Sequence, residues 1–366
     1  MARRIPLDAF DLLDPIARGG MGLVLRGEHR DLGIPVAIKV LSHARARQER
    51  AIAGFAREVR AMASLDHPAV VRVLDHGVVP SEAALADPDN LVAGSPYIVM
   101  ELAYGTLDHP ASPSTWSRTR AVLRTLLDAL AHAHARGLVH RDLKPANVLR
   151  VRGPDGASTL KLSDFGLAHA LASDPADERG AAAGTPQMMA PEQFRGAVRD
   201  FGPWTDLYAL GCIAFKLASG LPPFDHPDEE ELARLHLREP PPALVPLHAL
   251  PDGFEAWVQC LLEKAPQRRF QRASDAARAL LALGHVDAPI ASPTAVRAVP
   301  ALATAPHEHA SFERPIDPGS SSPRSSADAI DPTVEDLPTL SALTPARHRA
   351  PMDPRSPAVR SPSQPP

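Results

Sequence analysis

The sequence predicts an α+β protein in which a small, strand-rich lobe precedes a larger helical lobe, followed by a long tail. Short β-branched or apolar runs dominate the first hundred residues, whereas apolar residues recur with a helical period from Thr115 onward. Near Gly284 the composition shifts to Pro, Ser, Thr and Ala. These observations predict two packed lobes with a cleft between them, and a tail that does not form a further domain.

The small lobe is expected to combine strands with one helix. Residues 47–65 have a helical period that places Ile52, Phe55, Val59 and Met62 near one face. Four apolar or β-branched runs are predicted to be strands, at 23–29, 35–41, 70–79 and 96–102.

The large lobe is expected to be mainly helical. Its most apolar run, residues 207–221, contains Lys216 and is shorter than the roughly 20 residues that a membrane span needs, so we expect a buried helix there. Four helices are predicted, at 120–137, 206–220, 255–264 and 273–284.

Composition narrows the class of protein. The 366 residues are 44% apolar, enough for a sizeable core, and the net charge of -4 gives no overall attraction to nucleic acid or membrane. Cys212 and Cys260 lack metal-ligand spacing and are expected to be buried thiols in a reducing compartment. The N-terminus lacks the long apolar stretch of a signal peptide. We therefore expect a cytoplasmic protein with no membrane span.

The tail has a composition unlike the rest of the chain. Residues 286–366 hold 16 of the 40 prolines and cannot bury enough apolar area to offset their ordering entropy, so we expect disorder. The chain is therefore divided into an N-terminal extension (1–9), a folded domain (10–284) and a tail (285–366). The basic end of the tail, residues 345–360, could contact acidic partners, although a solvated tail is the simpler interpretation.

Three stretches of the small lobe carry candidate functional residues. The glycines of "IARGGMGLVL" (16–25) would let backbone N–H groups approach a phosphate, although a plain hairpin turn also fits. Lys39 in "VAIKV" lies on a strand-like run and, taken alone, would be the exposed residue of an edge strand. Glu58, taken alone, would be one of several exposed carboxylates of the helix at 47–65.

Three stretches of the large lobe concentrate polar groups. In "VHRDLKPANVL" (139–149) an acid, two bases and an amide lie within eight residues, between apolar flanks. In "KLSDFGLA" (161–168) Asp164 follows a strand-like run and precedes a glycine turn. "GTPQMMAPEQ" spans residues 184–193.

The order and spacing of these six elements resemble the protein kinase family, and most of all the bacterial branch of eukaryotic-like serine/threonine kinases. The resemblance covers roughly residues 10–283 and implies the bilobal protein kinase fold, a small β-rich N-lobe and a larger helical C-lobe, with transfer of the ATP γ-phosphate to protein Ser or Thr hydroxyls. A pseudokinase that senses nucleotide or recruits partners, and a small-molecule phosphotransferase, are the alternatives. Pseudokinases usually lack one or more of five residues, and all five are present here, which favours the active enzyme. They are Lys39, Glu58, Asp142, Asn147 and Asp164.

The resemblance implies a role for each matching residue. Asp142 is expected to be the catalytic base, with Lys144 contacting the transferred phosphoryl group. Lys39 is expected to hold the ATP phosphates and to pair with Glu58, whereas Asn147 and Asp164 bind Mg²⁺. The expected ATP-binding set is Ile16, Ala17, Arg18, Gly19, Gly20, Met21, Gly22, Leu23, Val24, Ala37, Lys39, Met100, Glu101, Ala103 and Leu149.

The same resemblance predicts two buried anchors. Asp206 should hold the backbone of the catalytic loop, and Arg269 should pair with Glu192. The chain departs from the family at Ala17, which replaces the first loop glycine, and at Met188, where tyrosine is more usual. His132 and His134 are expected to be ordinary helix residues, because positions i and i+2 do not share a helix face.

Regulation is predicted to differ from that of relatives activated by phosphorylation before the "GT". Arg141 is present, but Ala181, Ala182 and Ala183 occupy the usual acceptor positions. Only Ser173 and Thr185 carry hydroxyls between residues 170 and 186. We expect that Asp174, Asp177 or Glu178, or a bound partner, orders the segment, with Ser173 as the alternative acceptor. Protein substrates are the expected partners, and a regulatory partner could bind the tail, where Ser292, Ser322, Thr344, Ser356 and Ser361 each precede proline.

Overall fold

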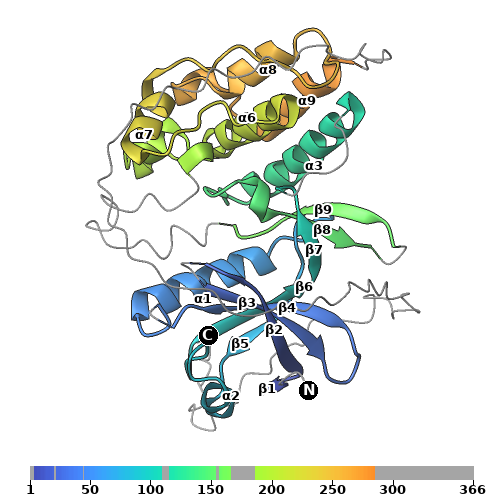
Figure 1. Cartoon of the computed structure of the whole chain (residues 1–366), viewed down its shortest axis with the longest axis vertical. Coiled ribbons are helices and arrows are strands. Elements are labelled where there is room, and N and C mark those ends of the chain that lie inside the picture. The colour runs from blue at the N-terminus through green and yellow to red at the C-terminus, as the bar shows by residue number, and fades with distance from the viewer. Residues whose placement is uncertain are drawn as a thin grey trace, which may run out of the picture.

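The computed structural model describes residues 4–19, 22–43, 45–108, 115–153, 156–165 and 186–284, without the side chains of Arg50 and Glu58. Within them the chain forms a small lobe dominated by strands and a larger lobe of helices (Figure 1). The predicted order of strand-rich and helical lobes is therefore confirmed. The tail lies outside the described residues, so its predicted disorder stays a prediction.

A six-stranded antiparallel sheet forms the small lobe, in the order β1-β2-β3-β4-β6-β5. The first strand pairs Ile5 with Leu12 and Leu7 with Phe10, so the sheet begins within the expected N-terminal extension. The strands are β1 (Ile5–Leu7), β2 (Phe10–Arg18), β3 (Gly22–His29), β4 (Pro35–Leu41), β5 (Val73–Val78) and β6 (Pro96–Glu101).

Both faces of this sheet are covered. Helix α1 (Glu49–Ala63) packs Phe55, Val59 and Met62 into the main core, as its period predicted. On the other face a second core contains Tyr97 and alternate residues of β4, together with the loop between β5 and β6. That loop carries α2 (Ser81–Ala86), a short helix that the sequence analysis did not predict.

A three-stranded sheet, β7-β8-β9, lies where the two lobes meet (Figure 1). It consists of β7 (Ala103–Thr106), β8 (Val148–Arg152) and β9 (Ser158–Leu162). Leu149 on β8 is opposite Lys161 on β9 and next to Thr106 on β7. Because β8 follows the HRDLKPAN stretch and β9 precedes Asp164, this sheet places both polar stretches at the junction of the lobes.

The large lobe is organised around α6 (Pro203–Ser219), whose apolar residues are almost all buried. The predicted buried helix is thus confirmed, and no helix in the described part of the chain is long and apolar enough to cross a membrane. Cys212 is buried as predicted, but Cys260, in the last turn of its helix, is only half-buried. The other α-helices are α3 (Trp116–His134), α5 (Pro191–Phe194), α7 (Glu229–Arg238), α8 (Phe254–Leu261) and α9 (Ala273–Ala282), of which α5 and α7 were not predicted.

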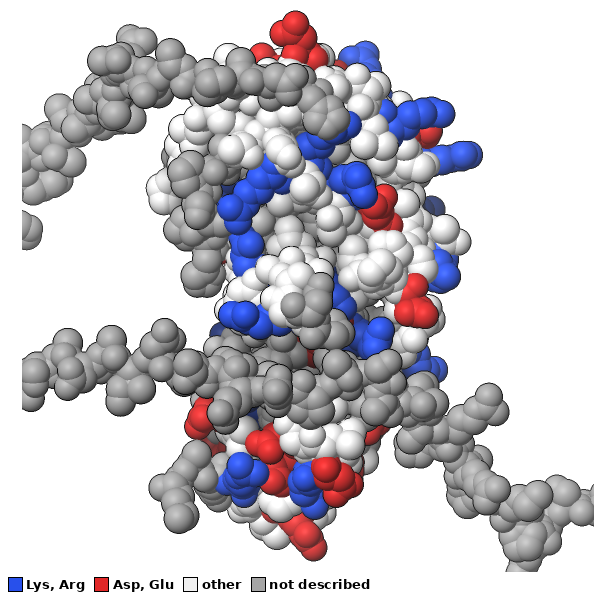
Figure 2. All heavy atoms as spheres, turned by 90° about the vertical axis from the view of Figure 1, so that its right-hand side faces the viewer, with Lys and Arg blue, Asp and Glu red and all other residues white. Residues whose placement is uncertain are grey.

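Charge is distributed unevenly despite the net charge of -4. On the face shown in Figure 2, Lys and Arg side chains are spread over much of the large lobe, with Asp and Glu side chains among them, and both signs also lie on the small lobe. The total charge alone does not reveal this distribution.

Candidate active site

The loop between α3 and β8 is held from below by Asp206, in the first turn of α6. Its carboxylate accepts hydrogen bonds from the backbone N–H groups of His140 (2.8 Å) and Arg141 (2.7 Å), and from His134 Nε2 (2.7 Å). Burial raises the pKa of Asp206, but the hydrogen bond and charge of His134, with His140, lower it overall. The predicted anchor is confirmed, and His134 is a member that the sequence analysis missed.

The two histidines of α3 serve different neighbours. The ring of His132 lies against that of His67, with 4.8 Å between the ring centroids, whereas His134 binds Asp206. The helical spacing that separates the two rings on the helix surface was predicted, but the buried partner of His134 was not. The sequence feature that could have indicated this contact is the position of His134, shortly before the loop that Asp206 holds.

Two polar residues of the loop, Lys144 and Asn147, contact the carboxyl-bearing residue Asp142. Lys144 Nζ lies 2.8 Å from Asp142 Oδ2. Asn147 donates its side-chain amide to the Asp142 backbone oxygen (2.8 Å) and to Oδ2 (3.2 Å). Asp142 is 8% exposed, so its carboxylate is oriented by these contacts rather than by water. The structure thus brings Asp142, Lys144 and Asn147 together as the sequence predicted.

Lys39 connects the two lobes. Its ammonium on β4 lies 2.8 Å from Asp164 Oδ1, just after β9. Lys39 is buried, whereas the side chain of Asp164 is 29% exposed, so this carboxylate faces open space as well as Lys39. The next residue, Phe165, is buried against the ring of His140, with centroids 4.7 Å apart. Glu58 lies on α1, but its side chain is outside the described part, and its pairing with Lys39 stays a prediction.

The glycine loop closes between β2 and β3. Gly19 and Gly22 exchange backbone hydrogen bonds of 3.0 and 3.3 Å. A Cβ at Gly22 would lie 2.3 Å from the backbone oxygen of Val40, so only glycine lets this strand approach β4. Ala17 pairs with Val24 in the ladder, so its methyl group is accommodated within the strand. Of the remaining predicted residues, Ile16 and Arg18 lie on β2, Leu23 lies on β3, and Gly20 and Met21 fall outside the described residues.

Apolar residues lie on both sides of the lobe junction. Ala37 on β4 pairs with Met100 on β6, and both are buried. Val24 and Leu149 are half-buried and pack against the main core from β3 and β8. Four residues of the predicted ATP-binding set therefore belong to one apolar cluster at the junction of the lobes.

Glu101 belongs to the predicted ATP-binding set, but the sequence analysis did not predict the partners of its side chain. Its buried carboxylate accepts hydrogen bonds from the Arg72 backbone N–H (2.6 Å) and from Lys161 Nζ (2.6 and 2.8 Å). The segment joining β6 to Ala103 on β7 is thereby tied to β9, two residues before the loop that carries Asp164. The sequence feature that could have indicated this ion pair is Lys161, a cation between Leu160 and Leu162 in a strand.

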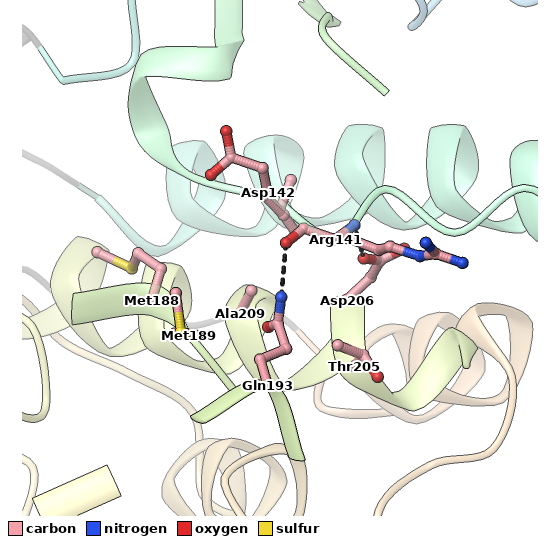
Figure 3. A pocket seen from close by; sticks show the side chains of 9 residues that line it. Arg141, Asp142, Met188, Met189, Gln193, Thr205, Asp206 and Ala209 are labelled. Carbon is pink, nitrogen blue, oxygen red and sulfur yellow. Dashed lines mark hydrogen bonds between the residues drawn. The ribbon is translucent and has the colours of Figure 1, made fainter. Parts of the chain in front are cut away.

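A pocket opens beside Asp142 (Figure 3). Met188 and Met189, both buried, form its apolar part. Met188 therefore lies next to the proposed base, where the sequence departs from the family pattern. The lining residues are Arg141, Asp142, Leu143, Met188, Met189, Gln193, Thr205, Asp206 and Ala209.

The predicted ion pair between Arg269 and Glu192 lies beneath this pocket. Arg269 binds Glu192 through two hydrogen bonds of 2.8 and 2.9 Å, and both side chains are at most 1% exposed. Thr205 donates to the same carboxylate (2.9 Å), and Arg269 also donates to the Glu263 backbone oxygen (2.7 Å). A bidentate pair with further hydrogen bonds satisfies both buried charges.

Comparisons with known proteins identify the family of this chain. Residues 10–281 match the model of the protein kinase domain. Serine/threonine-protein kinase Pkn1 of Myxococcus xanthus is 37% identical over 273 residues, covering 72% of this chain and 36% of Pkn1. Serine/threonine-protein kinase PknA of Mycobacterium tuberculosis is 36% identical over 296 residues, covering 78% of this chain and 64% of PknA.

A solved structure extends the comparison to the fold. The crystal structure of the Mycobacterium tuberculosis PknI kinase domain aligns with a TM-score of 0.52 at 25% identity, covering 78% of this chain and 100% of that domain. This chain spans less than two thirds of the length of Pkn1 and PknA. The chain belongs to the protein kinase family, and its similarity is to the serine/threonine kinases of bacteria.

Proposed function

We propose that this protein is an ATP-dependent serine/threonine protein kinase. One observation carries the proposal: Lys39 meets Asp164 across the lobe junction, while Asp142, Lys144 and Asn147 converge beside it. A cation for phosphate, carboxylate and amide oxygens for a metal ion, and a base are what phosphoryl transfer requires of a protein.

The residues present suit the nucleotide and the metal ion. Mg²⁺ prefers oxygen ligands and binds through one or two carboxylates together with substrate phosphates, which suits Asp164 and Asn147. Lys39 would hold the phosphates, and Ala37, Met100, Val24 and Leu149 would enclose the base. When bound, MgATP supplies the phosphoryl group and neutralises part of its charge.

The chain's own residues would then orient the acceptor. Asp142 accepts the proton of the substrate hydroxyl, and Asn147 holds its carboxylate in place through the 3.2 Å hydrogen bond. Lys144, 2.8 Å from Asp142, adds positive charge where the phosphoryl oxygens gather. Glu58 would compete with Asp164 for Lys39 in the active arrangement.

The proposal extends to partners and location. Proteins with Ser or Thr acceptors are the substrates, autophosphorylation is included, and a regulatory partner binds through the tail. The protein acts in the cytoplasm. This last point rests on the two cysteines, which lie far apart in the sequence and suit free thiols in a reducing compartment.

Labelled ATP with Mg²⁺ and dephosphorylated casein tests the activity. Wild type should label casein or itself on Ser and Thr, and Asp142→Asn should lower the rate by about 10²–10⁴ because the base is lost. Lys39→Met should act similarly through phosphate binding. Both variants should unfold at nearly the wild-type temperature. Nucleotide binding without any transfer by wild type would instead indicate a pseudokinase.

A further inference from the structure

Gln193 joins two parts of the large lobe that are far apart in the sequence. It lies on α5, directly after Glu192 of the buried ion pair. Its side-chain Nε2 donates to the Arg141 backbone oxygen (2.8 Å; Figure 3), and its Oε1 accepts from the Ala190 N–H (3.0 Å). The opposite amide orientation would place like groups against each other at both ends, so the two partners fix the orientation.

The bonded oxygen belongs to the peptide unit that leads into Asp142. The other end of that unit, the Asp142 N–H, points to His140 Nδ1 (3.3 Å). Gln193 and His140 therefore hold one rigid plane from both sides. Rotating this plane would turn Asp142, the residue beside the pocket.

The backbone at this point is strained. Arg141 has φ = 65°, a left-handed conformation that costs a residue with a side chain roughly 1–2 kcal/mol. Such a conformation persists only where its surroundings determine it. Asp206 holds the Arg141 N–H and Gln193 holds its oxygen, so both polar groups of this residue have buried or half-buried partners.

We propose that Gln193 is a positioning residue for phosphoryl transfer. Its amide couples the α5 platform, fixed by Glu192 and Arg269, to the orientation of Asp142. The inference rests on the proposed kinase function and adds to it a residue outside the catalytic loop. It predicts that the donor at Gln193, and not merely the bulk of its side chain, sets the turnover number.

Gln193→Leu tests the need for the amide. It preserves the bulk but leaves the Arg141 oxygen and the Ala190 N–H without their partner. The loss of one such bond corresponds to a roughly 5- to 50-fold lower kcat. The KM for ATP should stay within about twofold, because Gln193 is remote from Lys39 and the glycine loop.

Gln193→Glu isolates the donor. The carboxylate retains the acceptor for Ala190 but faces the Arg141 oxygen with a second acceptor, so kcat should fall at about pH 8. When the carboxyl group is protonated its O–H can donate to that oxygen again. The ratio of variant to wild-type kcat should therefore rise severalfold between about pH 8 and about pH 5.5, because the repulsion and burial favour the neutral acid. Taking the ratio removes the pH dependence that both proteins share.

Gln271→Glu is the matched control. Gln271 also donates its amide to backbone oxygens, those of Pro266 (2.9 Å) and Arg269 (2.8 Å), but it lies away from the catalytic loop. Its kcat ratio should not change with pH. All rates are measured with the full chain, MgATP and dephosphorylated casein, beside melting temperatures.

The outcomes separate the two proposals. An inactive wild type would overturn the kinase function itself. An active wild type with a flat Gln193→Glu ratio, or with an effect only on the KM for casein, would overturn the positioning role. If Gln193→Leu does not fold, the pH profile of Gln193→Glu decides alone.

Discussion

Two groups of charged side chains lie around the catalytic loop, and they differ in how they are satisfied. Below the loop, Glu192, Arg269 and Asp206 are at most 3% exposed and have all their described partners within the large lobe. In the cleft, Lys39 contacts Asp164 and Lys144 contacts Asp142, each at 2.8 Å, and in each pair a buried side chain meets a partly exposed one. The first group cannot exchange partners without unfolding, whereas a ligand can replace the contacts of the second.

This difference separates stability from function. We call Glu192, Arg269 and Asp206 the frame. A buried charge that loses its partner destabilises the fold strongly, so the frame determines the stability of the large lobe. In the cleft, Asp164 and Lys144 are partly exposed, so water can solvate either charge when its partner is removed. Substitutions in the frame should therefore act on the free energy of unfolding, and substitutions in the cleft on catalysis.

Arg269→Met should have the largest effect on stability. It leaves the Glu192 carboxylate buried without its bidentate partner, which costs roughly 3–5 kcal/mol of unfolding free energy. Urea denaturation of the full chain measures the change. Lys39→Met is the control from the cleft and should change stability by less than about 1 kcal/mol. Equal losses in the two variants would remove the distinction between frame and cleft.

Acid should weaken the frame through His236 on α7. This buried ring shares a 2.9 Å hydrogen bond between Nδ1 and the Tyr208 hydroxyl. Burial lowers the pKa of His236 most, and the positive charge of Lys264 lowers it further, to about 3. The ring therefore stays neutral in the fold, while in the unfolded chain it is protonated below about pH 6.5. The unfolded state binds the extra proton, so stability should fall by about 2 kcal/mol between pH 7 and pH 5 from this group.

His236→Gln provides the comparison for this pH effect. Glutamine can still hydrogen-bond the Tyr208 hydroxyl but does not titrate. Its unfolding free energy should decline less than that of wild type between about pH 7 and pH 5, by about the amount assigned to the histidine. Parallel curves for the two proteins would show that His236 is not the responsible group.

The frame and the cleft were not equally predictable from sequence. Asp142, Lys144, Asn147 and Asp164 follow short motifs, and local geometry alone brings most of them together. The pairing of Arg269 with Glu192 came from family resemblance, because 77 residues separate them.

Contacts without a motif were missed for a physical reason. Lys161 with Glu101, and His134 with Asp206, depend on how strands and helices from different parts of the chain pack. Helix α2 was missed because a six-residue helix has too few turns to display a period. Helical and strand periods sufficed for the lobes, but not for these long-range polar contacts.

Ser173→Ala should have a small effect, within about twofold in activity, if permanent charge or a partner orders the segment around it. Ser173 lies outside the described residues. A phosphate on Ser173 would bind Arg141, and the structure shows that the Arg141 side chain already contacts an aromatic ring. Its guanidinium lies 5.8 Å from the centroid of the Phe201 ring. Phosphatase treatment should likewise leave casein phosphorylation nearly unchanged. Silencing by phosphatase, with recovery on rephosphorylation of Ser173, would sink the hypothesis.

Removing the tail should have the smallest effect of all. A chain that ends at Gly284 retains α9 and the hydrogen bond from Trp116 Nε1 to the Gly284 oxygen (3.1 Å). We expect the same melting temperature and turnover as the full chain, because the composition of residues 286–366 offers little apolar surface to bury.

A chain that ends at Ala279 is the matched control for this truncation. It removes Leu280, which is fully buried, together with the acceptor of Trp116, and should lose roughly 2–5 kcal/mol. Thermal unfolding of the three chains places the edge of the folded domain between these two ends. A less cooperative transition for the chain ending at Gly284 would mean that the tail contributes to the fold. Unchanged stability for the chain ending at Ala279 would mean that the packing of α9 against α3 contributes less than its burial indicates.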